Sequence, residues 1–327
     1  MLPTIAGAGI VCSVGYDVFA ACAAIRCGLE HATESRFQDG QGEWLHVAAV
    51  PFEPPLTDTV ERCAGMLLPA LETCLAQVAQ PTTAVILLVP TGPGLPPDLA
   101  EALTTAVRDA FPQVPEVIIQ PADRPTGLAA LRSAGDLLEQ RGFQAVILAG
   151  VDTLLTTPIV RRLLRDGRLT GPTGIRIATP GEAAAAVLCL PGGPGLRCRG
   201  LGDGREDPAA TPRRADGLAS AGRAALAEAG LGMHEVAGRI ADVQMGLADL
   251  KEADLAHRRW STDTRPTCPL WQPCRSTGLI GAATAPMLLA NAWMAVRKDY
   301  AAGEHLLIHA GSDDGARSVG VFSAVRS

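Results

Sequence analysis

The sequence predicts an α/β protein built around a largely buried sheet. Short runs rich in valine, isoleucine and leucine, without polar alternation, are typical of strands covered on both faces. Longer segments with apolar residues at helical spacing separate these runs, and this alternation indicates an α/β fold. A third observation is an internal echo, in which a helix, a short turn and an apolar strand precede both Ala149–Asp152 and Ala310–Asp313. The echo fits a duplication and a coincidence between two ordinary αβ units equally well.

The predicted elements follow one another along the whole chain. Strands are expected at Thr4–Ala8, Ala84–Val89, Val117–Gln120, Ala145–Ala149, Ala183–Leu190, Leu306–Ala310 and Ser318–Ala324. Helices are expected over residues 57–78, 96–110, 126–141, 214–229 and 278–297. The Gly- and Pro-rich stretch 191–215 predicts a short strand near Leu196–Leu201, then an exposed loop, and is the expected junction between halves. Residues 260–276 are expected to form a second long loop.

Composition excludes several classes of protein. Of the 327 residues, 47% are hydrophobic and 19% are charged, which excludes a disordered chain. The net charge of −6 argues against a nucleic-acid partner, and no apolar run is long enough to span a membrane. The first residues lack the basic segment of a secretory signal. Nine irregularly spaced cysteines favour reduced thiols in a cytoplasmic protein, with no metal site and no cofactor.

Four segments together resemble the thiolase superfamily, and specifically the β-ketoacyl-ACP synthases. They are Gly7–Gly28, Thr126–Thr153, Pro180–Leu190, and Ser276–Ala292 with the strands that follow it. The resemblance covers both ends of the chain in the family's order. It implies a duplicated βαβαβαββ fold in a five-layer αβαβα stack, with residues 1–195 as one half and 196–327 as the other. The chain is shorter than an ordinary synthase, and the difference is expected in surface and dimer-cap loops.

The resemblance also implies where catalytic groups would lie. The family uses a cysteine thiolate at a helix N-terminus, where the helix dipole and oriented amides lower its pKa, and two histidines that stabilise an enolate and an oxyanion. The nucleophile position falls on Arg124, or on Asp123 if the turn shifts by one residue. The histidine positions fall on Met245 and Gly278. Acidic residues replace the apolar gate in Gly311–Gly315. The resemblance therefore predicts no catalytic residues and no condensation chemistry.

Arg124 is the most informative of these changes. A guanidinium at a helix N-terminus is electrostatically unfavourable unless it is paired with Asp123, Asp313, Asp314 or a bound anion. We therefore expect Arg124 to seal the former acyl pocket through one of these carboxylates, with Thr126 as a helix N-cap beside it. The alternative is a solvent-exposed arginine in a rearranged loop. The expected pocket-lining residues are Asp123, Arg124, Thr126, Asp313 and Asp314.

Other chemistry-bearing residues are expected to be structural. The cysteines singled out are expected to be small buried hydrophobic residues; they are Cys12, Cys22, Cys27, Cys63, Cys74 and Cys189. His305 and His309 are expected to be hydrogen-bonded core or edge residues. Asp152 and Asp313 are expected to cap the turns that follow their strands. The amphipathic segment 249–260, with Leu250, Leu255 and Trp260, is a candidate contact surface.

Three functions remain open. The first is a non-catalytic thiolase-fold adaptor, a homodimer or heterodimer, similar to accessory proteins associated with bacterial type VI secretion that serve a secretion effector. The second is a chain-length-factor-like partner of an active ketosynthase in fatty acid or polyketide-type synthesis, although such subunits usually have glutamine at the nucleophile position. The third is a 3-oxoacyl-ACP synthase type of acyltransferase with relocated catalytic residues.

Overall fold

The computed structural model describes residues 1–78, 82–169, 177–207, 214–243, 246–261 and 268–326. The first half contains eight framework elements: β1 (Thr4–Cys12), α2 (Thr59–Leu75), β4 (Thr83–Val89), α3 (Leu99–Ala110), β5 (Glu116–Pro121), α4 (Thr126–Gln140), β6 (Ala145–Thr153) and β7 (Glu182–Leu190). The second half repeats the sequence of element types: β8 (Gly195–Arg205), α6 (Asp216–Ala229), β9 (Val236–Ala241), α7 (Leu247–Trp260), β10 (Leu270–Trp271), α9 (Thr284–Arg297), β11 (His305–Gly311) and β12 (Ala316–Val325).

The strand order is also the same in both halves. The strands are hydrogen-bonded in the order β10-β9-β11-β12-β8-β1-β7-β6-β4-β5, so each half reads third, second, fourth, fifth, first. In each half the second strand runs parallel to the third and fourth, and the last strand is antiparallel to both of its neighbours. A short antiparallel contact between β1 and β8 joins the halves. The predicted duplication is therefore confirmed.

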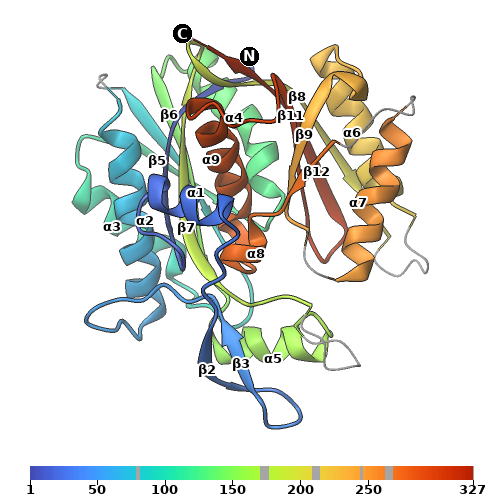
Figure 1. The fold of residues 1–327 in the computed structure, drawn as a ribbon. Helices are drawn as coiled ribbons and strands as arrows, with labels where there is room; N and C mark the ends of the chain where they lie inside the picture. Colours follow the sequence, from blue (N-terminus) through green and yellow to red (C-terminus); the bar gives the residue numbers. More distant parts are fainter. Residues whose placement is uncertain (79–81, 170–176, 208–213, 244–245, 262–267, 327) are drawn as a thin grey trace.

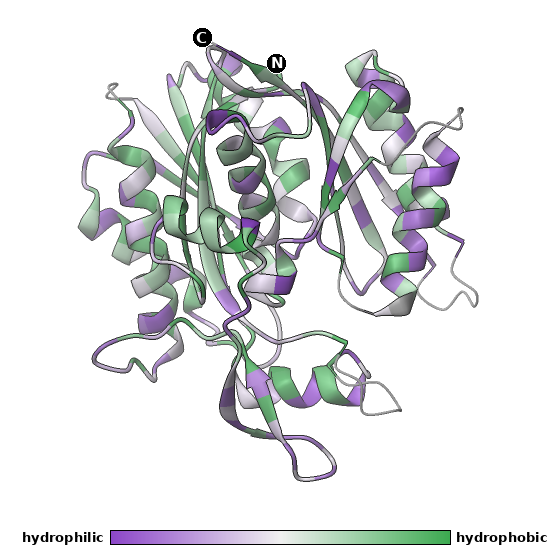
Figure 2. Cartoon of the chain, viewed as in Figure 1, coloured by the Kyte–Doolittle hydropathy of each residue, from purple (hydrophilic) through white to green (hydrophobic). Residues whose placement is uncertain are grey.

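Five layers are visible in Figure 1. Helices α2 and α3 cover the first sheet, α4 and α9 lie between the sheets, and α6 and α7 cover the second. Separate apolar clusters fill the spaces between layers, and the largest surrounds α9, where Met287, Leu288 and Leu289 are buried. Figure 2 shows apolar residues along the strands and the central helix, whereas α6 and α7 carry many polar residues. The predicted αβαβα architecture is thus confirmed.

Shorter elements extend from this framework. They are α1 (Val18–Arg26), the hairpin β2 (Thr33–Gln38) and β3 (Trp44–Val47), α5 (Thr157–Arg165), α8 (Cys274–Thr277) and two 3-10 turns, η1 (Met233–Glu235) and η2 (Gly281–Ala283). The hairpin and α5 project together below the layers (Figure 1), where Phe37 and Leu45 contact a small cluster that contains Ile159 and Leu163. The sequence signal missed this hairpin because few of its side chains are buried.

The Gly-rich junction contains a longer strand than expected, and most of the loop expected after it lies outside the described residues. Strand β8 has eleven residues and pairs with β12 along its length. A Cβ at Gly200, Gly202 or Gly204 would lie 2.1–2.2 Å from a carbonyl oxygen of α6. The glycines therefore allow α6 to lie directly on β8. In the sequence alone, the same glycines indicate a loop. We propose that the two halves join between β7 and β8. The boundary expected from the sequence, between residues 195 and 196, lies one residue inside β8.

The segments after residue 260 also differ from expectation. Within the described part of 260–276, the chain forms β10 and α8, so it is not a continuous loop. The helix expected over 278–297 begins only at Thr284. Gly278 and Gly281 have φ values of +73° and +46°, which a right-handed helix cannot contain. In the described ranges no helix is both long and apolar enough to cross a lipid bilayer.

Asp152, at the end of β6, ties the first sheet to the central layer. Its Oδ2 accepts a hydrogen bond of 2.9 Å from the backbone N–H of Ala282, so it serves a distant segment rather than the turn after its own strand. Its Oδ1 is buried and has no hydrogen-bond partner in the described structure. Burial raises the pKa of Asp152 from 3.8 to about 7, more than the Ala282 hydrogen bond lowers it.

We expect this carboxyl to make stability depend on pH. Because its pKa is higher in the folded than in the unfolded chain, its contribution is complete below pH 3.8 and is lost as the pH rises through about 7. Each unit of difference in pKa corresponds to about 1.4 kcal/mol. Urea unfolding of wild type and Asp152→Asn at about pH 5 and about pH 8 measures the effect, and only wild type should lose this stability. The exposed Asp299→Asn is the control, and identical pH profiles for wild type and Asp152→Asn would contradict the raised pKa.

Candidate functional site

The candidate site lies at the elbow between β5 and α4, at the carboxyl ends of several strands. Pro125 occupies the N-cap position and Thr126 is the first residue of α4. The Thr126 hydroxyl accepts a hydrogen bond of 3.0 Å from the Asp123 N–H, and the Asp123 carboxylate accepts one of 2.7 Å from the Arg124 N–H. Thr126 is therefore not the N-cap that we expected, because its hydroxyl closes the preceding turn instead.

The Arg124 side chain turns inward and is held by two carboxylates. Its Nη1 donates to Asp242 Oδ2 at 2.8 Å, and its Nη2 donates to Asp313 Oδ1 at 2.7 Å. Arg124 is 8% exposed, and the Asp242 side chain is 2% exposed. The expected pairing with Asp313 is confirmed, and the alternative of a solvent-exposed arginine is wrong.

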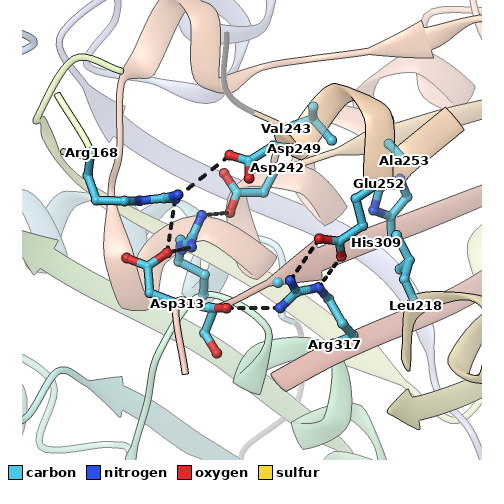
Figure 3. A pocket seen from close by; sticks show the side chains of 13 residues that line it. Arg168, Leu218, Asp242, Val243, Asp249, Glu252, Ala253, His309, Asp313 and Arg317 are labelled. Carbon is cyan, nitrogen blue, oxygen red and sulfur yellow. Dashed lines mark hydrogen bonds and ion pairs between the residues drawn. The ribbon is translucent and has the colours of Figure 1, made fainter. Parts of the chain in front are cut away.

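Further ion pairs surround this contact (Figure 3). Arg168 Nη2 lies 2.9 Å from Asp313 Oδ1 and 3.8 Å from Asp249 Oδ2, so Asp313 is shared between two guanidinium groups. On the other side, Arg317 forms a buried two-point ion pair with Glu252 of α7. The Arg317 side chain also donates to the backbone oxygen of Ser312 at 2.9 Å. The two ion-pair groups leave a cavity of only about 40 Å³ between them.

The electrostatics of the site favour a permanently charged arginine. Burial alone would lower the pKa of Arg124, but Asp242, Asp313, Asp123 and Asp249 outweigh it, and the pKa is raised. A protonated guanidinium is a hydrogen-bond donor with no lone pair for nucleophilic attack. At the elbow it can bind an anion or hold carboxylates in place, but it cannot form a thioester.

A larger cavity of about 620 Å³ opens beside the elbow. Its lining includes all the residues expected to line the former pocket, namely Asp123, Arg124, Thr126, Asp313 and Asp314. Asp314 was considered as an ion-pair partner of Arg124, but in the described structure it pairs with Arg205 instead. It accepts a hydrogen bond from the Ser312 hydroxyl and lies 3.4 Å from Arg205, and the hydrogen bonds from Ser312 and the Ala316 N–H lower the pKa of Asp314.

No histidine replaces the two expected imidazoles in the described part of the site. Met245 lies outside the described residues. At Gly278, φ is +73° and an added Cβ would lie 2.7 Å from the Thr179 carbonyl oxygen, so the backbone leaves no room for a side chain. His309 lines the small cavity, but burial lowers its pKa to about 3 and it is neutral at pH 7. Among the described residues its Nε2 has no hydrogen-bond partner, whereas His305 is hydrogen-bonded to Ser323 as expected.

The buried cysteines do not supply a replacement nucleophile. Five of the six that the sequence analysis singled out are buried, but Cys27 is exposed, at the end of α1. Burial raises the pKa of the Cys12 thiol to about 11 and that of Cys22 to about 12, and it also raises the pKa of Cys274. Cys274 lies near the site, where its thiol contacts the backbone oxygen of Val243 at 3.1 Å. A protonated thiol is a poor nucleophile.

Several residues of the site escaped the sequence analysis. Asp242 follows β9 and Asp313 follows β11, and the carboxyl ends of these parallel strands share one edge of the sheet. That rule could have identified Asp242. Glu252 and Arg317 carried no comparable signal, since Glu252 lies among other charged residues in the segment expected to be an amphipathic contact surface. In the structure Glu252 and Trp260 are buried, so of the three apolar residues proposed for that contact surface only Leu250 and Leu255 are exposed.

The site offers no cluster of metal ligands. Across the residues that the structure describes, no three histidine, cysteine, aspartate or glutamate side chains are grouped to hold a metal ion. The carboxylates of the site face arginines instead.

Comparisons with known proteins found similarity at the level of structure. No protein-family model matches the chain, and no curated protein matches its sequence. The ishigamide ketosynthase/chain length factor matches with 18% identity and a TM-score of 0.75, over 99% of this chain and 100% of that one. The ketosynthase ApeO in complex with its chain length factor ApeC, from Xenorhabdus doucetiae, matches with 14% identity and a TM-score of 0.77. The match covers 99% of this chain and 98% of that one.

A third structure is AntDE:AntF, a type II PKS acyl-carrier protein in complex with its ketosynthase. It matches with 12% identity and a TM-score of 0.80, over 99% of both chains. Identities this low establish a common architecture and leave the activity of this chain to its own residues. The matching halves, the five layers and the full-length structural similarity together show that the chain has the thiolase-like fold of ketosynthases and chain length factors.

Proposed function

We propose that the chain is a non-catalytic, chain-length-factor-like subunit that pairs with an active ketosynthase. The observation that carries the proposal is the buried Arg124 guanidinium, held by Asp242 and Asp313 at the elbow where the resemblance places a nucleophile. The backbone at Gly278 excludes an imidazole there as well. A thioester-forming condensation needs a thiolate and its helpers, so the chemistry must come from a partner.

The full-length similarity supports this function over the adaptor in secretion. The ApeO–ApeC structure is a ketosynthase with its chain length factor, and it matches this chain end to end. The names of the three structures described above do not refer to secretion, so the type VI hypothesis has no support beyond the resemblance that raised it. Arginine rather than glutamine at the elbow remains a departure from the pattern of chain length factors.

Strand β5 provides a surface for such a partner. It is the last strand of the sheet order and is hydrogen-bonded only to β4. Val117, Ile118 and Ile119 are half-buried, and no lysine lies in the strand to discourage pairing with another chain. An apolar edge strand can extend its sheet into that of a partner with the same fold. A heterodimer through β5 is therefore the arrangement we propose, and a homodimer through the same strand is its competitor.

An active acyltransferase with relocated residues is the remaining alternative. It would need a reactive thiol or hydroxyl beside a base. The buried thiols described above are held protonated, and the Thr126 hydroxyl is engaged by the Asp123 N–H. These observations favour a subunit without covalent chemistry.

The first test of the proposed function asks whether the buried ion pair of Arg124 stabilises the elbow. Arg124→Met leaves Asp242 buried without this guanidinium, and the free energy of unfolding should fall by about 3–5 kcal/mol. Adding Asp242→Asn should recover part of this loss, because the double variant buries no carboxylate at that position. Urea unfolding measures both, with the exposed Arg326→Met as the control. An Arg124→Met protein as stable as wild type would show that the buried pair does not hold the elbow.

The second prediction concerns chemistry. Incubation with acyl-CoA or acyl-loaded carrier protein should leave the intact mass of this chain unchanged, because the buried thiols described above are held protonated. Mass spectrometry of the protein co-purified with its ketosynthase supplies an internal control, since the ketosynthase should gain the acyl mass. A stable adduct on this chain would revive the acyltransferase reading.

The third prediction tests the partner. Affinity-tagged chain from native cells should co-purify, in equal amounts, with a thiolase-fold protein that has a cysteine at its elbow. Val117→Lys introduces a charge into the edge strand and should abolish this complex. Because Val117 also packs against a buried apolar cluster, the melting temperature of the isolated variant is measured alongside. Leu255→Lys on α7, 38% exposed in wild type, is the matched control. Retention of the ketosynthase by Val117→Lys, or recovery of a homodimer alone, would count against the proposed heterodimer.

A further inference from the structure

A third, separate cavity lies among α1, β10, α8 and α9. Its volume is about 440 Å³, within the range of small-molecule sites in proteins. None of its lining residues contributes to the two cavities near Arg124, and none belongs to β5. The proposed function gives this cavity no role, and pairing through β5 does not involve its walls.

The walls are apolar and partly aromatic. Ile25 of α1 and Leu270 of β10 line the cavity beside the rings of Trp271 and Tyr300. The centroids of these two rings are 6.1 Å apart and their planes are inclined by 32°. Half-exposed aromatic rings beside a cavity provide flat surfaces on which a planar ligand can stack.

Two arginines give the mouth of this cavity a positive charge. The Arg26 guanidinium lies 4.2 Å from the centroid of the Tyr300 ring, and no carboxylate among the described residues forms an ion pair with it. Arg275 is 3.7 Å from Glu30, and both side chains are substantially exposed, so solvent weakens this pair. Glu30 is the only acidic residue among the described lining residues. Two guanidiniums against one carboxylate favour an anion.

The inner wall carries a hydrogen-bond acceptor. Asn291 is 5% exposed, and its Nδ2 donates to the Met287 carbonyl oxygen at 2.9 Å. This orientation leaves Oδ1 as the free end of the amide, with no hydrogen bond to any described residue. Within the described structure the Tyr300 hydroxyl and the Trp271 ring N–H also have no hydrogen-bond partner. All three residues line the cavity, and Trp271 and Tyr300 are half-exposed, so a bound molecule with complementary groups fits these positions.

We propose that this cavity binds an aromatic carboxylate. Its carboxylate accepts hydrogen bonds from Arg26 and Arg275 at the mouth, where guanidinium groups match the geometry of a carboxylate. Its ring stacks against Trp271, and a hydroxyl at the far end of the ring donates to Asn291 Oδ1. The polar groups at the two ends fix the orientation of the ligand, and the aromatic walls hold its body.

Isothermal titration calorimetry with para-hydroxycinnamate tests the proposal on the full chain. The Arg26→Ala/Arg275→Ala double variant should bind at least about tenfold more weakly than wild type, because it loses the charged donors. Arg297→Ala is the matched control, since Arg297 also lies over an aromatic ring, Trp293 at 5.3 Å, but does not line the cavity. Its affinity should equal that of wild type.

Two analogues separate the contacts without any substitution. Cinnamate lacks the hydroxyl, and para-hydroxycinnamamide lacks the charge, so wild type should bind each more weakly than para-hydroxycinnamate. In the double variant the preference for the acid over the amide should disappear. Absence of binding to wild type, or equal affinities for wild type and the double variant, would overturn the proposal. Because the titration requires no ketosynthase, its outcome is independent of the proposed function.

Discussion

The ion pair between Arg124 and its two carboxylates is the interaction on which the arrangement of the candidate site depends. It joins the elbow of the first half to the carboxyl ends of two strands of the second half, through Asp242 and Asp313. A charge with little exposure is tolerated only when it is fully compensated, and here the compensation comes from segments more than a hundred residues away. The ion pair thus acts as a cross-brace between the two halves at the elbow.

Most of the architecture could be predicted from the sequence because it rests on periodicity. The buried strands β4, β6 and β11 appear as uninterrupted apolar runs, and their helices have a clear apolar face. Strand β8 was underestimated because its glycines serve close packing against α6, whereas glycine in a sequence more often marks a turn. The start of α9 was misplaced for the opposite reason. Two glycines inside an apolar run adopt positive φ values that hydrophobicity cannot reveal.

Residues of the site could be predicted from the sequence only where the resemblance marks their positions along the chain. Arg124 and Asp313 could be identified because they occupy positions that the resemblance marks, and their pairing follows from the cost of an isolated guanidinium at a helix start. Asp242, Arg168 and the Glu252–Arg317 pair depend on how distant segments meet in space. Their neighbours in sequence say nothing about burial, as Glu252 shows: it lies on a helix that looks solvent-facing, yet it is 4% exposed.

Under the proposed function, the backbone at Gly278 would make condensation chemistry hard to introduce into this chain. Replacing Arg124 by cysteine could bring back a thiol at the elbow, but the second change would have to introduce an imidazole where φ is +73° and a carbonyl oxygen stands 2.7 Å from any Cβ. That change requires the loop to be rebuilt before a new side chain can be of use. A chain in this conformation would need several concerted changes to carry a thiol and an imidazole together, so the dependence on a partner proposed above would be hard to undo by single substitutions.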